Sequence, residues 1–167
     1  MFKVVSPLRT MENQMRRSNL MLQITMGVMG GAASSQPLFE DSKAFNPSSE
    51  TAMAITGPVI LSTKRIVFET GASLDLEVHD AKSSGNWGVS GDVPIAQVFR
   101  VSGDVGPLRQ GNTLCGDQPI TFMAAWNEES SGFDYLGIAM FTGAAAPTSV
   151  DDQTICATYF YSMDVSD

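Results

Sequence analysis

The chain has 167 residues, of which 43% are hydrophobic and only 17% are charged, and its 10 basic and 18 acidic residues give a net charge of −8. This length suits one domain, and the composition argues against a chain that is disordered throughout. The acidic balance argues against nucleic-acid binding, because affinity for phosphate requires clustered lysine and arginine. No motif identifies a reaction, so the sequence indicates architecture and compartment more than activity.

Residues 1–35 have the order of features found in a secretory signal peptide. Four basic residues precede an apolar stretch, and small residues follow it directly. The apolar stretch is shorter than the roughly 20 residues that a transmembrane helix needs. We therefore expect a signal peptide that is cleaved after Ser34 or Ser35, with no membrane span in the mature chain. Translation starting at Met15 is an open alternative, which would make 1–14 an over-extended start.

Removal of the signal peptide increases the charge imbalance. Residues 1–35 hold four of the ten basic and one of the eighteen acidic residues, so 6 basic and 17 acidic residues remain, with a net charge of −11. A body this acidic favours basic partners over anionic membranes or nucleic acid. We expect the protein to be periplasmic or secreted.

The remaining chain divides into a tether and a β domain. Residues 36–50 mix proline, serine and acidic side chains without a regular period, which predicts a flexible tether. From 51 to 167, short apolar runs alternate with turn residues, and we expect a single antiparallel barrel or sandwich of about eight short strands, with longer loops at 80–94 and 103–113. The expected strands are Ala52–Thr56, Val59–Ser62, Arg65–Glu69, Ser73–Val78, Ile95–Ser102, Ile120–Asn127, Tyr135–Thr142 and Thr154–Tyr161.

Cys115 and Cys156 are the only two cysteines, and both lie in the part expected to be exported. An even number of cysteines in an oxidising compartment indicates one disulfide. Closing a loop of about 42 residues would stabilise the fold by roughly 4 kcal/mol if the effect is one of chain entropy. A reactive dithiol is the alternative, but close Cys-X-X-Cys spacing is absent.

Asp75, Glu77 and His79 share one face of an alternating strand, with two carboxylates and the only imidazole of the chain. Such a group can bind a metal ion or act in acid–base catalysis. The other interpretation is the solvated face of an amphipathic strand in an acidic protein. There is no Gly-X-Ser-X-Gly elbow and no phosphate-binding glycine motif. We expect no metal, no cofactor and no catalytic residue, and therefore a protein that is not an enzyme.

Trp87 is the residue that we single out for binding. It lies between Asn86 and Gly88 in a segment rich in glycine and serine. An exposed tryptophan in a loop is a frequent hot spot of binding. The alternative is that the ring folds back as a lid on the core.

The C-terminal half contains a two-cysteine frame, Asn112-Thr-Leu-Cys115-Gly followed by Cys156-Ala-Thr-Tyr159. In this frame the chain resembles small exported proteins of unknown function from Gram-negative bacteria, over about Ala52–Met163. The resemblance implies a disulfide-closed β domain in the periplasm and brings no known activity. The chain is also loosely similar to periplasmic inhibitors of C-type lysozyme, which combine short strands, turns and a disulfide.

These observations favour a monomeric, non-catalytic binding module. Its partner is expected to be a protein, an envelope component or a small ligand. Three alternatives stay open: a lysozyme-inhibitor-like protein, a small-ligand carrier with a cavity in the barrel, and a metal-assisted enzyme built on Asp75, Glu77 and His79.

Overall fold

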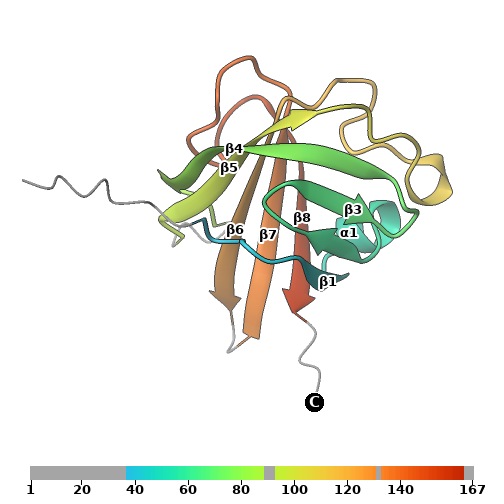
Figure 1. Cartoon of the computed structure of the whole chain (residues 1–167), viewed down its shortest axis with the longest axis horizontal. Helices are drawn as coiled ribbons and strands as arrows, with labels where there is room; N and C mark the ends of the chain where they lie inside the picture. The colour runs from blue at the N-terminus through green and yellow to red at the C-terminus, as the bar shows by residue number, and fades with distance from the viewer. Residues whose placement is uncertain (1–36, 89–92, 131–132, 164–167) are drawn as a thin grey trace, which may run out of the picture. The chain divides into compact units, whose positions relative to one another are not determined.

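The computed structural model describes residues 37–88, 93–130 and 133–163. They form antiparallel strands, each hydrogen-bonded to the next in sequence, and β8 pairs with β1 to close a barrel (Figure 1). The prediction of an all-β domain is confirmed, and the barrel is the architecture observed. The signal peptide expected over 1–35 lies outside the described residues. The strands are β1 (Lys43–Pro47), β2 (Val59–Leu61), β3 (Arg65–Phe68), β4 (Ser73–Ser84), β5 (Ile95–Ser102), β6 (Phe122–Ser130), β7 (Phe133–Phe141) and β8 (Ile155–Met163).

The prediction of a tether over 36–50 is wrong at its C-terminal end. Strand β1 lies there and pairs with β2 on one side and β8 on the other. Phe45 of this strand is buried in the barrel interior. Just before the strand, the backbone N–H groups of Leu38 and Phe39 donate hydrogen bonds to Gln97 Oε1 at 2.8 and 3.1 Å. Phe45 is the only large apolar side chain of β1, which gives too weak a period to identify a strand from sequence, yet this strand closes the barrel.

A helix replaces the strand expected over Ala52–Thr56. Helix α1 (Glu50–Ile55) begins after Ser49, whose Oγ accepts a hydrogen bond from the N–H of Ala52 at 3.2 Å. A serine cap and an acidic first turn both stabilise a helix start. In the described part of the chain, neither α1 nor the 3₁₀ turn η1 (Arg109–Gly111) is long and apolar enough to cross a membrane.

Strand β4 continues beyond Val78, where the expected strand ends, to Ser84. Val78 pairs with Phe99 of β5, and the register then shifts before Asp80. Such a β-bulge adds a residue to one strand and changes which side chains face the core. The alternating pattern therefore stops in the sequence although the strand continues, and the first residues of the loop expected at 80–94 are in fact strand.

The barrel interior is filled with apolar side chains. Successive strand residues point in and out alternately, and the inward ones form one buried cluster. An eight-stranded barrel encloses a space that is either filled by side chains or holds one small ligand. Here side chains occupy it, and the aromatic rings among them belong to Phe39, Phe45, Phe68, Phe99, Tyr159 and Tyr161.

A second apolar cluster covers part of the outside of β5, β6 and β7, so these strands carry buried side chains on both faces. The β4–β5 and β7–β8 connections cover it and are joined by a hydrogen bond from Val150 N to Asn86 O at 2.9 Å. Gly137 leaves room for the Trp126 ring, because a Cβ there would lie 2.2 Å from ring atom Cε2. We call this group the outer cluster. It consists of Trp87, Ala96, Val98, Phe122, Ala124, Trp126, Ala139 and Phe141.

Replacing Trp87 with alanine tests whether the outer cluster stabilises the fold. Trp87 is fully buried, so we expect Trp87→Ala to lower the free energy of unfolding by about 3–5 kcal/mol, as for other buried large aromatic residues. Phe133→Ala is the matched control, because this ring is 63% exposed. Urea unfolding measures both variants. Equal, small effects would show that the outer cluster contributes little to stability.

Candidate functional site

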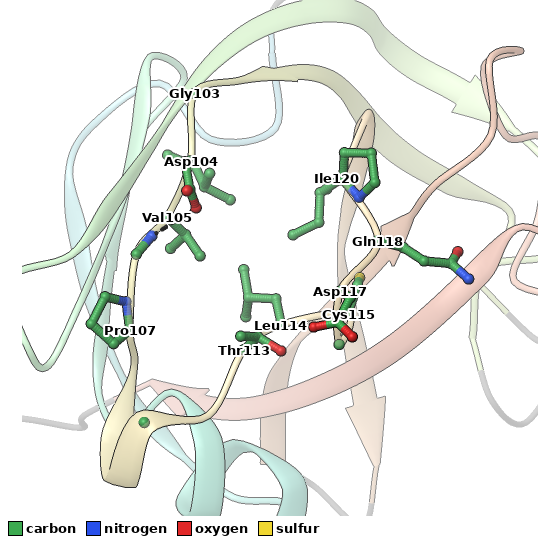
Figure 2. A pocket seen from close by; sticks show the side chains of 15 residues that line it. Gly103, Asp104, Val105, Pro107, Thr113, Leu114, Cys115, Asp117, Gln118 and Ile120 are labelled. Carbon is green, nitrogen blue, oxygen red and sulfur yellow. Dashed lines mark hydrogen bonds between the residues drawn. The ribbon is translucent and has the colours of Figure 1, made fainter.

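A pocket of about 600 Å³ lies at one end of the barrel, enclosed by the β5–β6 loop, residues 103–121 (Figure 2). Leu74 of β4 completes the lining. Pockets for small molecules usually have volumes of about 300–1,000 Å³. The loop at this end of the barrel therefore encloses enough space for a small ligand.

Apolar side chains form the inner wall of the pocket. Figure 2 shows Val105, Leu114 and Ile120 pointing from different parts of the loop toward the enclosed space. Leu74 and Leu114 are buried members of the interior cluster, and Val105 and Ile120 pack against that cluster. The inner wall is thus the end of the barrel core, and a ligand here would contact apolar atoms already held in place by packing.

The outer edge of the pocket is polar and acidic. Asp104 and Asp117 lie on opposite sides of the loop, whereas Gln118 points away from the enclosed space (Figure 2). Asp104 Oδ1 accepts a hydrogen bond from the N–H of Gly106 at 3.1 Å. Gly106 has a φ of 68°, which glycine adopts without steric cost. This turn fixes Asp104 at the edge.

Two bonds attach the loop to β8. The disulfide predicted between Cys115 and Cys156 is present, and Cys115 lines the pocket. The hydroxyl of Tyr159 donates a hydrogen bond to the backbone carbonyl of Leu114 at 2.9 Å. Because both contacts lie next to each other in the loop, they fix the apolar wall of the pocket relative to the barrel.

Contacts with α1 hold the opposite side of the loop. Arg109 donates a hydrogen bond to the carbonyl of Met53 and forms an ion pair with Glu69, with 2.8 Å between Nε and Oε2. Asn112 Nδ2 donates to the carbonyl of Ala54 at 3.3 Å. The last carbonyls of a helix lack partners within the helix, so these side chains satisfy them. The loop is therefore held at both sides before any ligand binds.

The structure separates the three candidate metal ligands on β4. Asp75 is paired with Arg65, with 2.7 Å between the carboxylate and guanidinium. His79 lies at the bulge, and its ring packs edge-on against Phe122 at 5.6 Å between centroids. Glu77 pairs in register with Arg100 of β5. Among the described residues, no group of three or more histidine, cysteine, aspartate or glutamate side chains is placed to bind a metal ion.

The expectation that the Trp87 side chain is exposed is wrong. Its side chain is fully buried, and its indole N–H donates to the carbonyl of Ser83 at 3.0 Å. The ring lies 6.5 Å from that of Trp126, between centroids. The alternative interpretation, a lid that folds back onto the core, describes its position.

The pocket was not identifiable as a site from sequence, where 103–113 is expected only to be a loop. The available signal was a set of apolar residues, including Val105 and Leu114, in a segment rich in glycine. In comparisons with known proteins, no family matches the chain, and no curated protein or solved structure is significantly similar to it.

Removing the disulfide should loosen the loop and leave the barrel folded. We expect the Cys115→Ala/Cys156→Ala double variant to lose about 2–5 kcal/mol of stability, as in other small disulfide-bonded domains. Amide hydrogen exchange should accelerate in 103–121 and stay slow in β6 and β7. Unchanged exchange in the loop would show that Tyr159 and α1 suffice to hold it.

Stability should fall at high pH because of two interior tyrosines. Burial raises the pKa of Tyr159 and Tyr161 above the ordinary value of 10.0. Above about pH 10 the unfolded chain therefore releases protons that the folded chain keeps, and unfolding becomes easier as pH rises. Urea midpoints at several pH values should fall less in the Tyr159→Phe/Tyr161→Phe variant than in Tyr135→Phe, the control. If the urea midpoints of the two variants fell equally as pH rises, the buried tyrosines would not be the origin of the pH dependence.

Proposed function

We propose that the protein is a non-catalytic binding module that holds a small ligand in the pocket enclosed by the β5–β6 loop. The supporting observation is that side chains fill the barrel interior, whereas the pocket at its end is open and has an apolar inner wall. This location differs from that of the carrier alternative, which expects a cavity inside the barrel. A loop already held by a disulfide and by hydrogen bonds loses little freedom on binding, which favours affinity.

Export to the periplasm or secretion is part of the proposal. Disulfides persist in oxidising compartments, and Cys115–Cys156 is the disulfide that holds the pocket. The signal-peptide pattern of 1–35 and the resemblance to small exported proteins of Gram-negative bacteria agree with this location.

A second candidate function is the binding of a basic protein, as in lysozyme inhibitors. It is favoured by the end of the β6–β7 pair around Glu129 and Asp134, which we call the β6–β7 ribbon. Phe133 is 63% exposed there, and Glu129 pairs in register with Asp134. Like charges directly opposite each other are unfavourable in a sheet, and a cationic partner would relieve their repulsion. The ribbon lies at the end of the barrel away from the pocket, so variants of each site can be tested separately.

A neutral fluorescent probe tests the pocket directly. We expect N-phenyl-1-naphthylamine to bind the oxidised protein saturably, with one probe per chain. Thr113→Trp, which places a large ring at the exposed edge of the pocket, should weaken binding by about tenfold or more. Thr148→Trp is the matched control, because Thr148 is exposed in the β7–β8 connection. Absence of saturable binding, or equal binding by both variants, would contradict the proposal.

A further inference from the structure

We propose that the ligand of this pocket is a cationic amphiphile, with an apolar body and a positively charged nitrogen. The inference rests on the proposed function and adds the chemical class of the ligand. Three observations support it: the inner wall of the pocket is apolar, two carboxylates lie at its edge, and no basic side chain is among the residues that line it.

The two carboxylates create a negative edge without a neutralising partner in the lining. Asp104 and Asp117 are both exposed, and they lie on opposite sides of the loop (Figure 2). No lysine, arginine or histidine is among the residues that line the pocket. A cleft lined by charges of one sign concentrates ligands of the opposite sign.

The arginine of the same loop is engaged elsewhere. Arg109 pairs with Glu69 and donates to the carbonyl of Met53, so its charge is paired with a carboxylate outside the pocket lining. Its side chain is not part of the pocket lining. The aspartates therefore determine the sign of the charge that a ligand meets at the edge.

The apolar wall requires more than a cation. The half-buried side chains of Val105 and Ile120 give the wall accessible apolar surface, and they lie beside Leu74 and Leu114, which are buried. A hydrated inorganic ion would leave this wall in contact with water, whereas an alkyl or aryl group would cover it. A ligand with an apolar body inside and an ammonium group between the aspartates satisfies both parts of the pocket. An apolar carboxylate of the same length would be repelled at the edge.

Competition for the bound naphthylamine probe tests this class. Hexylammonium, hexanol and hexanoate have similar apolar bodies and differ in charge at neutral pH. We expect hexylammonium to displace the probe at concentrations about tenfold or more below those of hexanoate, with hexanol in between. Raising the salt concentration from about 20 mM to about 500 mM should reduce the difference, because salt screens exposed charges.

Variants of the two aspartates identify the origin of the preference. Asp104→Asn/Asp117→Asn should remove the difference between hexylammonium and hexanol and leave hexanol binding unchanged, because asparagine keeps the acceptor for the N–H of Gly106. Glu77→Gln is the control, since it removes an exposed carboxylate of β4 outside the pocket lining. Equal binding of hexylammonium and hexanol by the unaltered protein would overturn this inference and leave the proposed function standing. Failure of the naphthylamine probe to bind would overturn both.

Discussion

Closure of the barrel by β1 and β8 is the constraint on which the rest of the structure depends. It gives both edge strands a partner, since β1 pairs with β2 and β8. It also encloses an interior of limited width, which the rings of Phe45, Phe99 and Tyr161 help to fill. Buried apolar side chains occupy the interior, and the pocket lined by the β5–β6 loop lies at an end of the barrel. The outer cluster in turn covers part of the outside of β5, β6 and β7.

The β5–β6 loop becomes a pocket because it is attached at separated points. The Cys115–Cys156 disulfide and the Tyr159 hydroxyl fix one side to β8, and Arg109 fixes the other side to α1. A loop of this length without such attachments would sample many conformations, and ordering it would oppose binding. Tyr159 links the barrel interior to the loop, since its ring packs in the interior and its hydroxyl donates a hydrogen bond to the carbonyl of Leu114.

Short apolar runs between turn residues predicted most of the strands, and the features that depend on distant contacts were missed. Ile95–Ser102 is predicted with the bounds of β5 itself, and the Cys115–Cys156 disulfide is confirmed. β1 was missed because its role in closing the barrel depends on β8, far away in the sequence. Trp87 was misplaced because local composition indicates a loop but cannot show that Trp126 lies beneath it. The pocket was missed for the same reason, as its walls come from β4 and from a loop held by β8 and α1.

The most direct test of the account is an NMR titration of the oxidised protein with hexylammonium, followed through the backbone amide signals. We expect saturable shifts at Val105, Leu114 and Ile120, and at Leu74 across the pocket, with little change at Leu136, an interior residue outside the pocket lining. Shifts concentrated at Leu136 and other interior residues outside the lining would instead place the ligand inside the barrel. Shifts confined to the β6–β7 ribbon, or no saturable shifts, would equally contradict the claim that the β5–β6 loop encloses the binding site.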